Sequence, residues 1–352
     1  SPHRFFKVIM QDIFLVFAEI YFRLTCDKKD KKGRKNEDVM DDYDELDLAV
    51  ELAGLRLPNP LLLASGIADE TAGSMIRAVK EGAGGVVTKS LNLEGRDGHG
   101  NPVVVEMDGG LINAMGLPNP GVDDFGKEIK EYLKETGGGR PIIGSVFGSD
   151  MDEYAETANR ICRFGVKAVE INGSCPNAEG LGLEFGQDPD TIEDLVSGVK
   201  GNCDAPVFFK LTPNTHDIVA LAKAAERGGA DGVVAINTLK AMKIDIHLAR
   251  PILTNTSGGL SGPAIKSVGV KAVYDIAKSD LGIPIIGVGG ITGFQDAVEY
   301  IQAGATAVQI GTAVMWDNLA VFGEIREGMR AFMSRMGYGS VDEMIKLALE
   351  VA

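Results

Sequence analysis

From Leu46 onward, short apolar runs alternate with longer amphipathic segments, and this alternation constrains the fold more than any other feature. Each run is almost continuously apolar, which is typical of parallel strands buried on both faces. The segments between them carry apolar residues at three- and four-residue spacing, which predicts helices. Eight runs occur, at residues 59–65, 84–90, 141–147, 167–172, 206–211, 231–237, 284–290 and 306–311. They predict an α/β fold of the (β/α)8 TIM-barrel type, with a doubly wound sheet as the alternative.

Two connections in this pattern are too long to be simple turns. The first runs from Leu91 to Gly139, after the second predicted strand, and the other runs from Leu239 to Gly262, after the sixth. Long loops inside compact domains are usually functional. In a barrel the loops that follow the strands form the active-site face, so both connections are expected to border a site.

The first 45 residues differ in character from the rest of the chain. An apolar segment at 5–24 is interrupted by charged residues, which argues against a membrane span, and it lacks the features of a signal peptide. A charged stretch without apolar periodicity follows and is expected to be flexible. We therefore expect an N-terminal appendage at 1–45 and a barrel domain at 46–352. An amphipathic helix on a tether and an over-extended gene start upstream of Met40 both fit the appendage.

Charge and cysteine usage exclude several classes of partner. The net charge of −15 repels phosphate backbones and anionic lipid, so neither nucleic acid nor a membrane is expected as a partner. The four cysteines are scattered and have no metal-ligand spacing, so no metal site is expected. Reduced thiols and a cytoplasmic location are expected. Cys162 and Cys203 are interpreted as small buried hydrophobic residues.

Glycine turns follow the last two predicted strands. Gly289-Gly290 precedes a helix expected to begin near Gly293, and Gly311-Thr312 follows the eighth strand. Barrels often bind phosphate with these two loops, where backbone N–H groups and a helix N-terminus meet the anion. A phosphorylated ligand is therefore expected here, with simple tight turns as the alternative.

Cys175 differs from the other cysteines because it lies in a polar loop, NGSCPN, directly after the fourth predicted strand. A thiol needs cationic or dipolar help to act as a base or a nucleophile. Lys89 and Lys210 each end an apolar run, so their ammonium groups are expected to point into the crevice and to provide that charge. Solvated lysines are the alternative.

Amide side chains recur at the same end of the predicted barrel, at Asn113, Asn172, Asn177 and Asn237-Thr238. An amide both donates and accepts hydrogen bonds, so it matches a planar ring with alternating N–H and C=O groups. A single loop asparagine is often only a turn residue. The joint placement of these residues favours recognition of a pyrimidine-like ring.

The chain resembles the dihydroorotate dehydrogenase family over about residues 46–335. The resemblance rests on motifs in this order: NPLLLASG, VVTKS, LINAMGLPNPG, EINGSCPN, FFKLTPN, AINTLK, GGLSGPAIK, IIGVGGI and AVQIGTA. The joint set is specific to the family, whereas the glycine motifs alone would also fit other flavin barrels. The resemblance implies a flavoprotein oxidoreductase that binds FMN and oxidises dihydroorotate to orotate in pyrimidine biosynthesis.

The resemblance also implies roles for individual residues. Cys175 stands where the class 1 enzymes have their catalytic base, and class 2 enzymes have serine there. Ser145 stands where the family usually has asparagine, so a water or a neighbouring group is expected to replace that contact. FMN contacts are expected at Ser65, Lys89, Ser90, Asn172, Lys210, Ile236, Gly262, Gly289, Gly290, Gly311 and Thr312. Substrate contacts are expected at Lys89, Asn113, Ala114, Met115, Gly116, Leu117, Asn172, Asn237 and Thr238.

Segments 237–246 and 258–266 look like the 1B branch, whose partner subunit carries FAD and an iron–sulfur cluster. This implies a heterotetramer, with a homodimer as the alternative. In the implied mechanism the Cys175 thiolate takes the C5 proton of dihydroorotate, and FMN is the hydride acceptor. Three alternatives stay open: a flavin barrel that acts on another dihydropyrimidine, a fumarate-dependent 1A enzyme, and a non-catalytic flavin-binding scaffold.

Overall fold

The computed structural model describes residues 46–173 and 186–350. The expected appendage at 1–45 and the loop that contains Cys175 lie outside the described residues. The appendage and the role of Cys175 as a base therefore stay predictions. The chain divides between Leu46 and Asp47 into two units, and the barrel belongs to the second.

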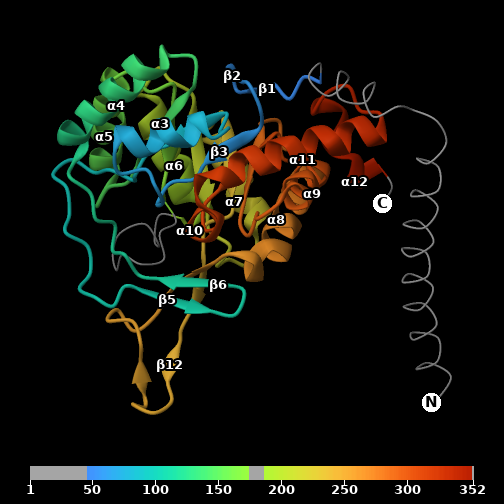
Figure 1. The fold of residues 1–352 in the computed structure, drawn as a ribbon. Helices are drawn as coiled ribbons and strands as arrows, with labels where there is room; N and C mark the ends of the chain where they lie inside the picture. The colour runs from blue at the N-terminus through green and yellow to red at the C-terminus, as the bar shows by residue number, and fades with distance from the viewer. Residues whose placement is uncertain (1–45, 174–185, 351–352) are drawn as a thin grey trace, which may run out of the picture. The chain divides into compact units, whose positions relative to one another are not determined.

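Eight parallel strands close into a barrel (Figure 1). Every strand lies inside one of the eight apolar runs, and neighbours around the barrel follow one another along the chain. This confirms the predicted (β/α)8 fold and excludes a doubly wound sheet. The strands are β3 (Leu61–Leu63), β4 (Gly85–Val87), β7 (Ile142–Val146), β8 (Ala168–Ile171), β9 (Val207–Leu211), β10 (Gly232–Ala235), β15 (Ile285–Val288) and β16 (Ala307–Ile310).

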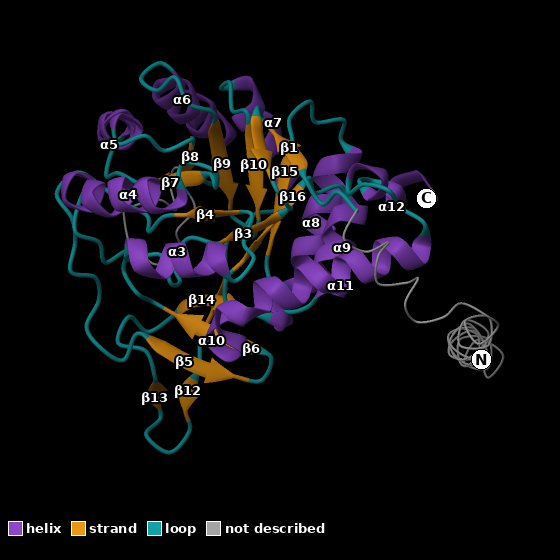
Figure 2. Cartoon of the chain, turned by 45° about the horizontal axis from the view of Figure 1, so that its top comes forward, coloured by secondary structure: helices purple, strands orange, loops and turns teal. Residues whose placement is uncertain are grey.

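Helices surround the barrel (Figure 2). Several begin where a side chain can accept a hydrogen bond from the first turn: Asp150, Asp188 and Asp217 each accept from the backbone N–H three residues further on. Every described helix is too short or too polar to cross a lipid bilayer. The helices between and after the strands are α3 (Ala72–Lys80), α4 (Val122–Thr136), α5 (Met151–Arg163), α6 (Pro189–Lys200), α7 (Ile218–Arg227), α8 (Lys266–Lys278), α9 (Phe294–Ala303), α10 (Ala313–Asp317), α11 (Val321–Met336) and α12 (Leu347–Glu350).

Smaller strands lie at both ends of the barrel (Figure 1). The hairpin of β1 (Val50–Leu52) and β2 (Leu55–Leu57) lies at one end, with Leu52 and Leu57 fully buried. At the other end the two long connections pair with each other in an antiparallel sheet of order β11-β14-β6-β5. Its strands are β5 (Val104–Met107), β6 (Gly110–Asn113), β11 (Leu239–Ala241) and β14 (Gly258–Ser261), and the hairpin of β12 (Ile244–Asp245) and β13 (Arg250–Pro251) projects beyond them.

The structure corrects the interpretation of two cysteines. Cys162, in the last turn of α5, and Cys203, in the connection from α6 to β9, form a disulfide bond with their Cα atoms 6.7 Å apart. The expectation that both are reduced was therefore wrong. The two residues are 41 positions apart in the sequence, and only the packing of α5 beside α6 brings them together.

The disulfide gives a first testable prediction. Closing a loop of this length restricts the unfolded chain, so Cys162→Ser should lower the free energy of unfolding by up to ~4 kcal/mol. Denaturant unfolding with and without a reducing agent measures this loss. Cys203→Ser is the matched control and should match the reduced wild type. Equal stability of the oxidised and reduced wild-type protein would contradict the prediction.

Candidate active site

A cavity of about 480 Å³ lies at the carboxyl ends of the barrel strands. Its wall combines residues that follow the barrel strands with residues of β6, β14 and the loop after β6. The sequence-predicted residues that line it are Ser65, Lys89, Ser90, Asn113, Met115, Gly116, Leu117, Asn172, Lys210, Ile236, Asn237, Thr238, Gly262, Gly289, Gly290, Gly311 and Thr312. One cavity therefore brings together residues that the sequence spreads over nearly 250 positions.

Two predicted site residues are not placed in this wall. Ala114 is fully buried in a small hydrophobic cluster with Ile112 and Leu253, so its side chain belongs to the packing beneath β6. Its backbone carbonyl lies 3.1 Å from a ring nitrogen of His99. Cys175 lies outside the described residues.

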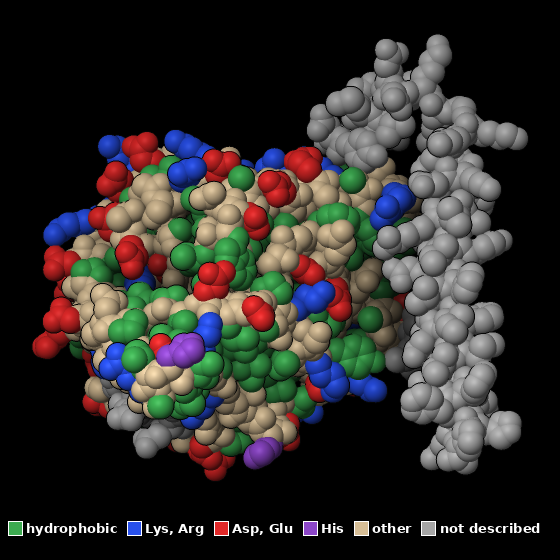
Figure 3. Space-filling view, turned by 60° about the horizontal axis from the view of Figure 1, so that its bottom comes forward, with side chains coloured by type: hydrophobic (Ala, Val, Ile, Leu, Met, Phe, Trp, Pro, Cys, Tyr) green, Lys and Arg blue, Asp and Glu red, His purple; other side chains and the backbone are tan. Residues whose placement is uncertain are grey.

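Hydrophobic side chains gather on the face of the molecule that carries the cavity (Figure 3). Val104 and Met315 line the cavity and are also exposed to solvent. Further exposed hydrophobic residues lie on α10 and around the β12–β13 hairpin: Met242, Ile244, Ile246, Leu248 and Trp316. Large exposed apolar patches commonly mark interaction sites.

The barrel interior carries a polar layer near the cavity. Alternate residues of a barrel strand face the interior, and bulky apolar residues usually fill it. Here Ser145 of β7, Glu170 of β8, Lys210 of β9 and Gln309 of β16 are all buried, and Ser145 is the direct strand neighbour of Glu170. Buried polar groups are stable only when they bond to one another, so this layer fixes side-chain positions.

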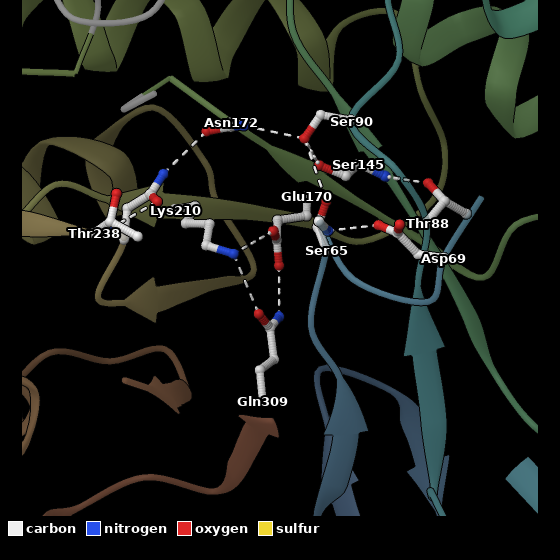
Figure 4. Close-up of polar contacts among 12 residues, drawn as sticks. Ser65, Asp69, Thr88, Ser90, Ser145, Glu170, Asn172, Lys210, Thr238 and Gln309 are labelled. Carbon is white, nitrogen blue, oxygen red and sulfur yellow. Dashed lines mark hydrogen bonds and ion pairs between the residues drawn. The ribbon is translucent and has the colours of Figure 1, made fainter. Parts of the chain in front are cut away.

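A chain of hydrogen bonds crosses the cavity wall from β4 to β10 (Figure 4). The hydroxyls of Ser90 and Ser145 lie 2.8 Å apart, and the amide nitrogen of Asn172 donates to Ser90 at 3.0 Å. Asn237 in turn donates to the side-chain oxygen of Asn172 at 3.3 Å, and Ser65 lies 3.3 Å from Ser90. At Ser145, where the resemblance led us to expect a replaced contact, the hydroxyl thus bonds to Ser90, and the backbone N–H donates to the hydroxyl of Thr88 at 3.0 Å.

Both predicted lysines reach the cavity, but their environments differ. Lys89 is buried and its Nζ lies 3.3 Å from Oε1 of Glu70, whose side chain is 69% exposed. Lys210 is buried and its Nζ lies 3.2 Å from Oε1 of Glu170, whose side chain is 1% exposed. Because solvent screens the first pair and not the second, Lys89 retains more of its positive field than Lys210.

The glycine turns form one end of the cavity. Gly262, Gly289 and Gly290 have φ angles of +98°, +125° and +71°, which side chains other than glycine rarely adopt. A Cβ on Gly290 would also lie 2.8 Å from the carbonyl oxygen of Gly262. The bare backbone of these turns can therefore approach a ligand closely, as a phosphate group requires.

The helix expected to assist this end is already capped. The carboxylate of Asp296 accepts hydrogen bonds from the backbone N–H groups of Thr292 and Gly293 at 2.9 Å and 3.1 Å. The side chain of Asp296, in the first turn of α9, thus accepts the hydrogen bonds of these two backbone N–H groups. The glycine turns offer further donors to a phosphate, and the expected contribution of this helix N-terminus stays a prediction.

Sequence reasoning missed Asp69, which lies in the loop after β3 and lines the cavity. It is fully buried, and its Oδ2 accepts a hydrogen bond from the backbone N–H of Gly66 at 2.5 Å. Burial raises the pKa of Asp69 to about 6, against the lowering effects of the Gly66 hydrogen bond and the charge of Lys89. An aspartate in a loop gives no signal of such burial in the sequence.

Sequence reasoning also missed Glu170 and Gln309, although a signal was present. Each is a polar residue inside an otherwise apolar strand, in AVEI and AVQI respectively. Lys210 was predicted because it ends an apolar run, and the structure places it inside β9. A polar side chain in a strand buried on both faces must find a partner inside the barrel, and these three residues are partners of one another.

The closed barrel and its lysine-lined cavity define an enzyme of the (β/α)8 class, in which ligands bind at the carboxyl ends of the strands. The chain belongs to the dihydroorotate dehydrogenase family, whose family model matches residues 47–333. This confirms the family expected from the motifs, which is a family of flavoenzymes. Among the described residues, no group of three or more His, Cys, Asp or Glu side chains could hold a metal ion.

Curated relatives cover nearly all of the barrel unit. The chain is 54% identical to a protein of Pyrococcus furiosus over 87% of this chain and 100% of that protein. It is 50% identical to a protein of Thermoplasma acidophilum over 86% of this chain and 99% of that protein. Both are named the catalytic subunit of dihydroorotate dehydrogenase B (NAD(+)).

A solved structure shares the fold. It is that of DHODH from Eimeria tenella in complex with ferulenol, with a TM-score of 0.75 and 23% sequence identity. The likeness covers 86% of this chain and 88% of that one. At this identity it concerns the fold alone.

The raised pKa of Asp69 predicts a pH dependence of stability. Because the pKa in the folded protein lies above 3.8, the folded state holds this proton more tightly than the unfolded chain. The contribution of Asp69 to stability is therefore complete below about pH 4 and is lost as the pH rises through about 6. Asp69→Asn keeps an oxygen for Gly66 and should be more stable than wild type at neutral pH by up to ~3 kcal/mol.

Denaturant unfolding at several pH values between about 4 and 8 checks this. The difference between Asp69→Asn and wild type should vanish toward about pH 4. Exposed Asp204→Asn is the matched control and should follow the wild-type profile. Identical profiles for Asp69→Asn and wild type would refute the assignment.

Proposed function

We propose that this chain is the catalytic subunit of a class 1B dihydroorotate dehydrogenase, which oxidises dihydroorotate to orotate in pyrimidine biosynthesis. One observation carries the proposal: two buried lysines and a bonded chain of amides and hydroxyls converge on one cavity at the carboxyl ends of a barrel. The relatives whose sequences are 50% and 54% identical to this chain are named as the catalytic subunit of this enzyme.

The cavity fits FMN. At one end the bare backbone of Gly262, Gly289 and Gly290 suits a single phosphate, and Gly311 and Thr312 border the same space. At the other end Lys210, Asn172 and Ser90 present donors at fixed positions, which suit the oxygens and nitrogens of a flavin ring. Ser65, Lys89 and Ile236 complete the proposed contacts. When bound, FMN supplies the hydride acceptor for the oxidation.

The substrate is proposed to bind over this site, against the second sheet. Asn113 on β6 and Asn237 with Thr238 after β10 face the same cavity, and Met115 to Leu117 line it beside them. Their amides can pair with the alternating N–H and C=O groups of the dihydroorotate ring. Lys89, whose ion-pair partner within residues 46–173 and 186–350 is the exposed Glu70, suits the substrate carboxylate.

Cys175 is proposed as the base that removes the C5 proton. It follows β8 in the sequence, as Asn172 does, and Asn172 lies in the cavity wall. A thiol with a reference pKa of ~8.5 becomes an effective base near positive charge, which the cavity lysines supply. This role rests on the sequence motif, since the cysteine lies outside the described residues.

The relatives are named catalytic subunits, which supports a partner subunit for this chain. We propose that the partner carries FAD and an iron–sulfur cluster, passes electrons to NAD, and completes a heterotetramer. The exposed hydrophobic residues beside the cavity mouth offer a surface for such a subunit. We place the enzyme in the cytoplasm, although disulfides are rare in that compartment, and regard residues 1–45 as an appendage without a role in flavin binding.

Anaerobic stopped-flow measurement of flavin bleaching tests the proposal. Dihydroorotate should bleach the flavin of the purified chain, whereas dihydrouracil, which lacks the carboxylate, should not. Cys175→Ala should retain its flavin and bleach ~10²–10⁴-fold more slowly, the usual value of a general base. Cys175→Ser should retain a little activity, mainly at high pH, because a hydroxyl is a weaker acid than a thiol.

Cys26→Ala is the matched control, since no motif includes Cys26, and it should bleach at the wild-type rate. Faster bleaching by dihydrouracil than by dihydroorotate would overturn the substrate assignment. Bleaching of Cys175→Ala at the wild-type rate would assign the base to another residue.

A further inference from the structure

A closed group of three buried side chains lies at the floor of the cavity (Figure 4). The Nζ of Lys210 donates to Oε1 of Glu170 at 3.2 Å and to Oε1 of Gln309 at 3.4 Å. The Nε2 of Gln309 donates to Oε2 of Glu170 at 2.6 Å. The three residues come from β9, β8 and β16, so the group joins strands on different sides of the barrel.

Only part of this group reaches the ligand space. Lys210 and Gln309 line the cavity, whereas Glu170 is fully buried behind them and is not part of its wall. Glu170 therefore acts on a ligand without touching it, through the positions of Lys210 and Gln309 and through its charge. A carboxylate in so buried a place is costly unless it is paired and fully hydrogen-bonded, and here both of its oxygens accept.

Glu170 and Gln309 restrict Lys210 in different ways. Glu170 supplies a charge that neutralises the ammonium in a region from which solvent is excluded. Gln309 supplies no charge, but its amide bridges the lysine and the carboxylate and so fixes the position of Nζ. Lys89 lacks such an arrangement, because its partner Glu70 is largely exposed.

We propose that Glu170 and Gln309 are positioning residues that hold Lys210 as a charge-neutralised hydrogen-bond donor to the flavin, with Glu170 setting the net charge beside the ring. The inference rests on the proposed FMN site. Its consequence is that the reduction potential of the flavin depends on a residue that does not touch it. Removing the negative charge favours the reduced flavin, which gains negative charge, and removing the positive charge disfavours it.

A charge cycle tests this on the full-length chain loaded with FMN. The flavin midpoint potential should rise in Glu170→Gln, fall in Lys210→Met, and return toward the wild-type value in the Glu170→Gln/Lys210→Met double variant. The double variant removes both charges and leaves no unpaired ion, so it also guards against failure of a single variant to fold. Opposite shifts in the single variants that cancel in the neutral double variant assign the potential to the net charge of the pair, and a departure from the sum of the two single shifts measures their coupling.

The variant Gln309→Met separates the effect of the position of Lys210 from the effect of the charges, because Gln309 is uncharged. It should leave the potential unchanged and weaken FMN binding about tenfold, the value of one hydrogen bond to a charged group, as measured by quenching of FMN fluorescence on addition of the apoprotein. An unchanged potential in Glu170→Gln, or Gln309→Met with wild-type affinity, would overturn the proposal. Failure of the wild-type chain to bind FMN would instead overturn the proposed function before any variant is compared.

Discussion

The buried polar layer between β7, β8, β9 and β16 is the interaction on which the site depends. A barrel interior excludes water, so Ser145, Glu170, Lys210 and Gln309 can remain there only by bonding to one another or to a residue of the cavity wall. The resulting hydrogen bonds hold these side chains, which come from separate strands, in fixed positions at the floor of the cavity. The barrel thus positions a lysine to within the tolerance of a hydrogen bond, which a surface loop could not do as well.

The other parts of the site are built on this floor. Ser145, the strand neighbour of Glu170, bonds to Ser90; Ser90 accepts from Asn172, and Asn172 accepts from Asn237 along the wall. The two long connections pair across almost 150 residues of sequence, as the hydrogen bond from Asn113 to Gly259 illustrates, and form the opposite wall. The cavity thereby lies between a rigid barrel end and a separate sheet, and two lysines with different residual charge border it.

The barrel could be predicted from the sequence because strands buried on both faces leave continuous apolar runs, as at Leu61–Leu63. The lysines and amides of the site could be predicted because polar residues that end such runs must lie at the barrel mouth. The second sheet could not be predicted, because strands as short as Leu239–Ala241 are defined by pairing with distant residues and not by a pattern of apolar residues in their own sequence. The same holds for the Cys162–Cys203 disulfide and for the burial of Asp69, which tertiary packing alone determines.

The central claim is that this cavity is built for a flavin with a single phosphate, because the turns at Gly289-Gly290 and Gly311-Thr312 border one end of a limited space. The most direct test is to purify the full-length chain alone, release its flavin by denaturation, and identify the flavin by chromatography and mass spectrometry. The account predicts a yellow protein that releases stoichiometric FMN. Release of FAD from this chain, or a colourless protein that does not take up added FMN, would contradict it.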